Sequence, residues 1–149
     1  GVQVITVPDQ RWARCDIKSV ALLANVLAYN AARQAGAQDA VFCETDGTVN
    51  EATAANLFLV EDGRLVTPAN GPRLLAGVTR DKIVQMTGAT ERRVTKDELL
   101  NADEVFLSST TAEAVPVIAV DGKPIGSGKP GPKTAEVYAQ FVRTFAGGQ

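Results

Sequence analysis

The sequence contains no histidine among its 149 residues, and its only cysteines are Cys15 and Cys43. The absence of imidazole excludes Ser-His-Asp and Cys-His catalysis, together with most zinc sites built on histidine. Two distant cysteines with scattered carboxylates make a poor metal site, so no metal is expected. They also indicate a reducing compartment rather than a disulfide framework. Chemistry must therefore come from Lys, Asp, Glu, Tyr, Ser, Thr or Cys side chains, or from an organic cofactor.

The sequence also lacks a strong excess of either charge and a long apolar run. Its 15 basic and 17 acidic residues are interspersed and give a net charge of −2. No face is basic enough to predict nucleic-acid binding, and no basic amphipathic helix suggests a membrane surface. The longest apolar stretch, residues 20–32, is interrupted by Asn25 and Asn30 and is too short to span a bilayer. Without a visible signal peptide, a cytoplasmic location is predicted.

The length and composition predict one domain over residues 1–149. A hydrophobic content of 45% is ordinary for a soluble globular protein of this size, which can bury its own core. No repeat, low-complexity segment or internal linker divides the chain. Gly1 leads directly into an apolar run without an initiator methionine. This start is typical of a segment from the middle of a longer protein.

Hydrophobic periodicity and turn residues predict an α+β fold with mixed strands and no regular βαβ alternation. A long helix is expected over residues 19–35, because Val20, Leu23, Val26, Leu27 and Ala31 fall at helical spacing. Asp62-Gly63 and Asp121-Gly122 each predict a hairpin. Further helices are expected over residues 77–86, after the capping-box pattern 95–98, and over residues 132–145. Strands are expected at residues 2–7, 40–44, 56–60, 64–67, 91–94, 105–107, 115–120 and 123–125.

The first candidate for chemistry is Lys18, just before the predicted long helix. Its apolar neighbours, Ile17 and the run 20–23, are expected to desolvate its amine in part. Desolvation lowers the pKa of an amine and favours the neutral nucleophile that a Schiff base requires. The same sequence also fits an ordinary exposed lysine in the first turn of a helix.

Three further segments could bind a polar ligand. Glu51 lies in the segment 46–56 among small residues, and a carboxylate there could hold a pyridine nitrogen protonated. Residues 74–80 begin a helix, where backbone N–H groups, the helix dipole and the Thr79 hydroxyl could bind an anion. Four hydroxyl residues, 108–111, follow a predicted buried strand and could donate to phosphate oxygens. Each segment alone is equally compatible with a plain loop, helix start or turn.

Taken in order, the four segments resemble the fold-type IV pyridoxal-phosphate (PLP) enzymes. The motifs are Arg-Cys-Asp-Ile-Lys, Gly-Thr-Val-x-Glu with a following Asn-x-Phe, Leu-x-Gly-Val-Thr-Arg, and Ser-Thr-Thr. The resemblance runs from about Arg11 to Phe145 and is nearest to the D-amino-acid aminotransferase branch. It implies a mixed-sheet, barrel-like large domain and a PLP-dependent transaminase, which moves an amino group between an amino acid, D- or branched-chain, and a 2-oxo acid.

The resemblance also implies roles for individual residues. Lys18 matches the catalytic lysine that forms the Schiff base with PLP and then moves a proton at the substrate Cα. Glu51 matches the carboxylate at the pyridine nitrogen, and Leu75 matches the apolar side chain packed on the ring. The expected phosphate-binding residues are Val78, Thr79, Ser109 and Thr110.

Members of the resembled family carry a smaller N-terminal domain ahead of this segment and are typically homodimers. The resemblance therefore predicts that residues 1–149 are the C-terminal cofactor-binding domain of a two-domain enzyme, present as a fragment, a truncated form or half of a split enzyme. Two alternatives stay open. One is a PLP lyase acting on aminodeoxychorismate, and the other is a non-catalytic domain that keeps the fold for assembly.

Overall fold

The computed structural model describes residues 1–146, in which ten strands join one sheet. The strand order is β6-β5-β4-β8-β9-β1-β2-β3-β7, and β10 pairs with β9. The pairs β1–β2, β1–β9 and β5–β6 are parallel, and the other pairs are antiparallel. The strands are β1 (Val2–Pro8), β2 (Asp39–Cys43), β3 (Thr48–Ala52), β4 (Asn56–Glu61), β5 (Arg64–Pro68), β6 (Thr90–Arg92), β7 (Val94–Thr95), β8 (Glu104–Ser109), β9 (Glu113–Val120) and β10 (Lys123–Pro124).

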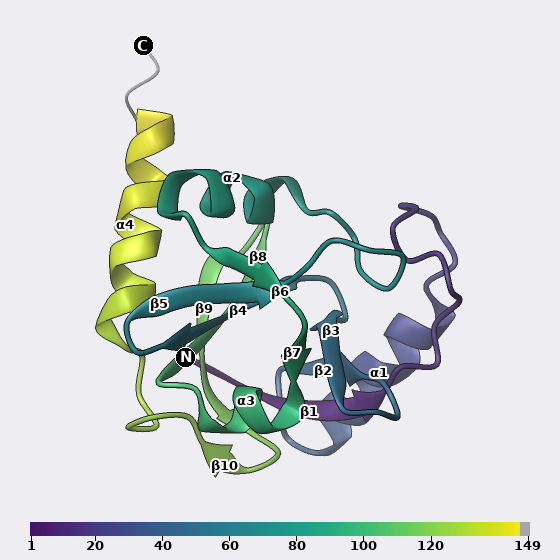
Figure 1. The fold of residues 1–149 in the computed structure, drawn as a ribbon. Coiled ribbons are helices and arrows are strands. Elements are labelled where there is room, and N and C mark those ends of the chain that lie inside the picture. Colours follow the sequence, from purple (N-terminus) through teal and green to yellow (C-terminus); the bar gives the residue numbers. More distant parts are fainter. Residues whose placement is uncertain (147–149) are drawn as a thin grey trace.

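The sheet curls into a barrel-like shape. Its two end strands, β6 and β7, are consecutive in the chain and are separated only by Arg93. The two edges therefore lie beside each other, and the strands surround a common interior in Figure 1. This arrangement confirms the predicted α+β fold with a mixed, barrel-like sheet.

In strands β4 and β8 both faces are buried, and side chains alternate between them along each strand. In β4, Leu57 and Leu59 point into the barrel interior, whereas Phe58 and Val60 join an outer cluster. Phe58 stacks on Phe106 of β8, with ring centroids 4.8 Å apart. Because both of their faces are covered, β4 and β8 each contain a continuous apolar run rather than strict alternation.

Helices cover the outer face at two places. Helices α2 (Val78–Thr87) and α4 (Pro132–Ala146) pack on the cluster that contains Phe58 and Phe106. Helix α1 (Leu23–Gln34) covers Phe42 of β2 with Ala28 and Ala32. The short α3 (Lys96–Asn101) begins with the predicted capping box between Thr95 and Glu98. None of the helices within residues 1–146 is long and apolar enough to cross a membrane.

The expected boundaries need three corrections. Helix α1 begins at Leu23 rather than at residue 19, so Lys18 lies in an irregular loop. The segment 46–56, for which no strand was predicted before residue 56, contains strand β3, which pairs with β2. The single strand expected at residues 91–94 is divided at Arg93 into β6 and β7, because the chain crosses there from one sheet edge to the other.

The large apolar residues whose spacing predicted helix α1 do not form its buried face. Val20, Leu23, Val26 and Leu27 are exposed by 97, 73, 51 and 59%, and the helix packs on the sheet through alanines instead. Alanine permits a close approach of helix and sheet, and the larger apolar side chains point outward. Contiguous exposed apolar patches on soluble proteins mark interaction sites.

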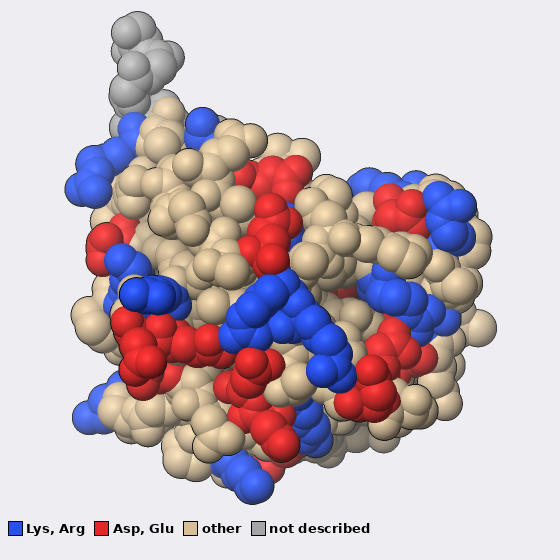
Figure 2. All heavy atoms as spheres, in the orientation of Figure 1, with Lys and Arg blue, Asp and Glu red and all other residues tan. Residues whose placement is uncertain are grey.

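Basic and acidic side chains lie side by side on part of the face drawn in Figure 2. Partly exposed ion pairs of the chain include Arg92 with Glu61 and Glu98, and Arg93 with Asp46. Water and salt screen such exposed pairs, so they add little to stability.

Substitution Phe106→Ala should lower the free energy of unfolding by about 3–5 kcal/mol, because it removes a fully buried ring and leaves a cavity beside Phe58. The matched control is Val142→Ala on the outer side of α4, which is 37% exposed and should change stability by less than about 1 kcal/mol. Urea unfolding of both variants measures the difference. If both variants lost the same free energy of unfolding, packing in the outer cluster would not stabilise the fold as described above.

Candidate active site

A cleft with a volume of about 540 Å³ opens beside helix α1. Its walls come from the loop after β1, one face of α1, the end of β3, the start of β4, the start of α2 and the end of β8. Cofactor sites commonly have volumes of about 300–1,000 Å³. The structure brings all the sequence-predicted site residues to this cleft, although they are spread widely along the chain: Lys18, Glu51, Leu75, Val78, Thr79, Ser109 and Thr110.

A β-bulge in β3 places Glu51 in the cleft. Val41 pairs with Ala52 and Cys43 pairs with Val49, so two steps along β2 match three steps along β3. Val49 and Ala52 consequently both face the barrel interior, and the side chain of Glu51 is free to point elsewhere. Bulges re-aim side chains in this way beside functional sites.

The carboxylate of Glu51 is buried and hydrogen-bonded. One oxygen, Oε2, accepts from the backbone N–H of Leu75 at 3.1 Å and from Nδ2 of Asn56 at 3.2 Å. The other, Oε1, pairs with Nη1 of Arg11. A carboxylate offers about four lone-pair positions, so these three bonds leave room for one more donor. Burial raises the pKa of Glu51 above its ordinary value, and Arg11 offsets part of this effect.

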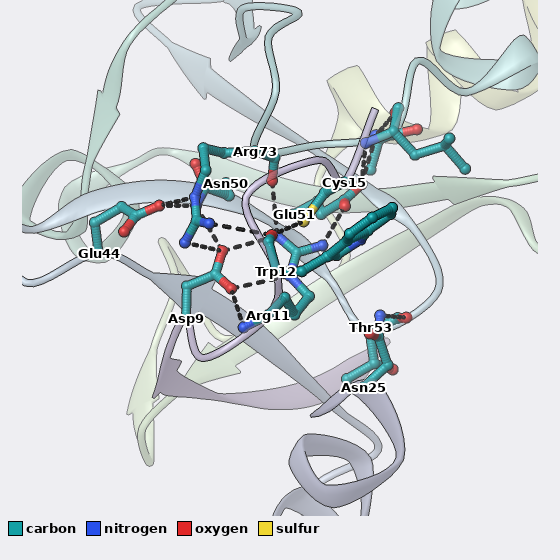
Figure 3. Close-up of polar contacts among 12 residues, drawn as sticks. Asp9, Arg11, Trp12, Cys15, Asn25, Glu44, Asn50, Glu51, Thr53 and Arg73 are labelled. Atoms are coloured by element: carbon teal, nitrogen blue, oxygen red, sulfur yellow. Dashed lines mark hydrogen bonds and ion pairs between the residues drawn. The ribbon is translucent and has the colours of Figure 1, made fainter. Parts of the chain in front are cut away.

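Arg11 joins Glu51 to a second buried carboxylate, Asp9. Its Nη2 donates to Asp9 at 2.8 Å and to the backbone carbonyl of Arg73 at 2.7 Å, and its guanidinium lies 4.2 Å from the ring centre of Phe42. Figure 3 shows the side chains of Asp9, Arg11 and Glu51 pointing toward one another. Burial alone would raise the pKa of Asp9, but its bonds to Arg11 and the charge of Arg11 outweigh burial and lower that pKa.

The start of helix α2 forms another wall. Its N-cap is Gly77, and Thr79 is buried, whereas Val78 is 82% exposed at the cleft. A Cβ at Gly77 would collide with Oδ1 of Asn56, so glycine lets the helix start approach the residues around Glu51. The first backbone N–H groups of a helix have no partner within it and favour an anion.

Ser108 completes this wall from β8. It pairs in register with Asn56 of β4, is 1% exposed, and lines the cleft. Its Oγ has no hydrogen-bond partner, which is unfavourable for a buried hydroxyl unless a ligand supplies one. The next two residues are more accessible: Ser109 is half-buried and bonds the backbone N–H of Ala112, and Thr110 is exposed.

Lys18 lines the same cleft, but the expected desolvation by its neighbours is wrong for this chain. Lys18 is exposed, and Ile17 and Val20 are themselves exposed by 44 and 97%. The neighbouring apolar side chains point outward with it rather than covering it. Leu75, by contrast, is half-buried beside Glu51, where an apolar wall was expected.

Two residues at the site were not singled out from the sequence. Arg11 only marked the start of the resembling region and had no assigned role, and Ser108 was one hydroxyl residue in a run of four. The sequence signal for Ser108 was its position directly after a predicted buried strand, because a hydroxyl there lies at the rim of the sheet. No sequence signal pairs Arg11 with Glu51, 40 residues away, because the bulge and the loop decide that contact.

The sequence model of the family described as "Amino-transferase class IV" matches residues 2–120. This chain belongs to that family. A D-alanine aminotransferase of Bacillus licheniformis is 46% identical over 97% of this chain and 53% of that protein. One of Staphylococcus aureus (strain N315) is 42% identical over 96% of this chain and 52% of that protein. The class IV chain therefore spans about half the length of the relatives it matches.

Solved structures agree with this assignment. The branched-chain amino acid aminotransferase of Escherichia coli superposes with a TM-score of 0.83 at 32% identity, and the match covers 99% of this chain and 53% of that one. The PLP form of the branched-chain enzyme of Thermobaculum terrenum gives a TM-score of 0.86 at 26% identity, over 99% of this chain and 52% of that one. The described part of the chain thus shares the class IV fold.

Substitution Gly77→Ala should destabilise the chain by about 1–3 kcal/mol, because the new methyl group must displace Asn56 and with it a hydrogen bond to Glu51. Gly71→Ala is the matched control, since nothing lies within 4 Å of a Cβ built there. Thermal unfolding of both variants checks the prediction. Equal stability of the two would mean that the helix start does not need its close approach to Asn56.

Proposed function

We propose that this class IV chain is the cofactor-binding domain of a PLP-dependent transaminase. The observation that carries the proposal is the convergence of Lys18, the buried carboxylate of Glu51 and the start of α2 on one cleft. The domain would bind the cofactor for the transfer of an amino group between an amino acid and a 2-oxo acid. The D-alanine aminotransferases among its relatives favour a D-amino acid as the donor over a branched-chain one.

The residues of the cleft fit PLP. The unpartnered Oγ of Ser108 and the free N–H groups at the start of α2 could donate to a phosphate, with Thr79, Ser109 and Thr110 nearby. The fourth lone-pair position of Glu51 could accept from a protonated ring nitrogen. Leu75, half-buried beside that carboxylate, could pack against the ring. When bound, PLP supplies the electron sink for the electron pair left at the substrate Cα.

Each residue would then act on a stated atom. Lys18 Nζ would hold the cofactor covalently, and after its release it would take the proton from the substrate Cα. Glu51 would keep a proton on the ring nitrogen. The hydroxyl and backbone donors around α2 would hold the phosphate, and this would keep the ring positioned next to Lys18.

The exposure of Lys18 suggests that further protein covers the cleft during turnover. The mouth of the cleft is lined by exposed apolar side chains, which include Leu22, Val26 and Tyr29 at 51, 51 and 44%. The relatives are about twice as long as this chain. We propose that a smaller domain of the same enzyme, or a second subunit of a homodimer, covers these side chains and desolvates the lysine amine.

Lys18→Ala should abolish covalent attachment of PLP, because the amine that forms the bond is removed. Reduction of the PLP-treated chain with borohydride, followed by peptide mass spectrometry, should place an adduct on Lys18 in the original chain and none in the variant. Lys82→Ala, an exposed lysine of α2, is the matched control and should keep the adduct. An adduct of similar yield in Lys18→Ala would refute the assignment.

Ser108→Ala should weaken PLP binding by roughly 10- to 150-fold, since a hydrogen bond to a charged group contributes about 1.5–3 kcal/mol. The ligand-free variant should be as stable as the original chain or more so, because an unpartnered buried hydroxyl is removed. Fluorescence titration with PLP and thermal unfolding measure the two quantities. Ser127→Ala in the exposed glycine-rich loop is the control, and a stability loss without weaker binding in Ser108→Ala would argue for a structural hydroxyl.

A further inference from the structure

The side chains of Asp9, Arg11 and Glu51 form an ion-pair chain that is almost closed to solvent, with exposures of 0, 5 and 8%. At the outer end, Asp9 also accepts from Asn50 at 2.8 Å and lies 3.6 Å from Arg73, which bonds Glu44 at 2.6 Å. At the inner end, Glu51 lines the cleft. The three buried groups together carry one net negative charge, which faces the cleft through Glu51.

Arg11 is held more firmly than an ion pair alone requires. Four contacts fix its guanidinium: Asp9, Glu51, the carbonyl of Arg73 and the ring of Phe42. It occupies one oxygen of Glu51 and leaves Oε2 to Asn56 and the backbone of Leu75. A planar guanidinium held in this way orients a carboxylate better than a lysine ammonium would.

We propose that Arg11 is a positioning residue of this enzyme, which fixes both the orientation and the charge of Glu51 for a ring nitrogen in the cleft. The inference rests on the proposed function, because it takes the cleft to bind PLP. A proton shared between Glu51 and the ring nitrogen resides mainly on the group with the higher pKa. Burial raises the pKa of Glu51, so without Arg11 the proton would move from the ring to the carboxylate.

The other titratable side chains of the cleft do not replace Arg11. Cys15, Lys18, Tyr29 and Asp39 also line it, and Asp39 is bonded to Thr53. Within the described residues, the hydrogen bonds to the Glu51 carboxylate come from Arg11, Asn56 and Leu75. Arg11 is the charged member of that set.

The test is the titration of Glu51 in the ligand-free chain by ¹³C NMR of carboxyl-labelled glutamate, with Glu51→Gln to assign the resonance. In Arg11→Met we expect the pKa of Glu51 to rise by about one to three, the usual effect of losing an opposite charge at contact distance. Arg11→Lys should raise it less, because the charge remains. Arg73→Met is the matched control: it removes a cation that contacts Asp9 and Glu44 but not Glu51, and should leave the pKa of Glu51 nearly unchanged.

The stability of Arg11→Met should also depend on pH with a defined sign. A carboxyl whose pKa is higher in the folded chain than in the unfolded one stabilises the fold at low pH, and that contribution is lost as pH rises through the folded pKa. If Arg11→Met unfolds at neutral pH, it should therefore refold near a pH of about 4, or at neutral pH when Glu51→Gln is added. Failure of both rescues would overturn the proposal.

A second readout uses PLP labelled with ¹⁵N in its ring. The ¹⁵N chemical shift of the ring nitrogen should have the value of a protonated nitrogen in the original chain and in Arg73→Met. In Arg11→Met it should move toward the unprotonated value. An unchanged Glu51 titration in Arg11→Met, or an equal change in Arg73→Met, would overturn the role of Arg11. Absence of PLP from Lys18 in the original chain would instead refute the proposed function, and the ligand-free titration would still decide the Arg11–Glu51 coupling.

Discussion

Burying a carboxylate is unfavourable unless hydrogen bonds and an opposite charge replace the water that it loses. In this chain the carboxylate is Glu51, and the groups that satisfy it come from three separate segments. Arg11 belongs to the loop after β1, Asn56 begins β4, and the N–H of Leu75 precedes α2. Satisfying this one side chain therefore ties together the segments that form the cleft, and loosening any of them would leave a buried charge short of partners.

The barrel provides the frame for that arrangement. Strands β4 and β8 are register partners, so Asn56 and Ser108 reach the same rim from opposite chain directions. The bulge in β3 then turns Glu51 toward that rim, while Val49 and Ala52 keep the interior closed. A regular strand would have sent either Val49 or Ala52 to the wrong face, because side chains alternate strictly along an unbroken strand.

Some groups of the cleft still lack a partner within the described residues. The Oγ of Ser108 has none, no side chain caps the start of α2, and Lys18 is exposed. The ion pairs of Arg11 with Asp9 and Glu51, by contrast, are complete and almost closed to solvent. The site thus combines a rigid, fully bonded base with an open set of donors, which is the arrangement that preorganised binding of a charged ligand requires.

Local chemistry alone determined much of this protein. Apolar runs bounded by Asp62-Gly63 and Asp121-Gly122 specify hairpins because a tight turn needs residues that accept positive φ, and both pairs have it in the structure. The pattern from Thr95 to Glu98 specifies a helix start because its hydrogen bonds are local. The predicted site residues, from Lys18 to Thr110, rested instead on the resemblance to a family, and the structure places them around one cleft.

Tertiary structure decided what those patterns could not express. Helix α1 begins at Leu23 and buries Ala28 and Ala32 rather than its larger apolar residues, because the neighbouring sheet selects the packed face. The bulge beside Glu51 depends on pairing with β2, and the partner of Glu51 depends on where the loop bearing Arg11 is folded back. Propensity and spacing act over a few residues, whereas a buried ion pair between residues 40 positions apart is set by the energy of the whole packed fold.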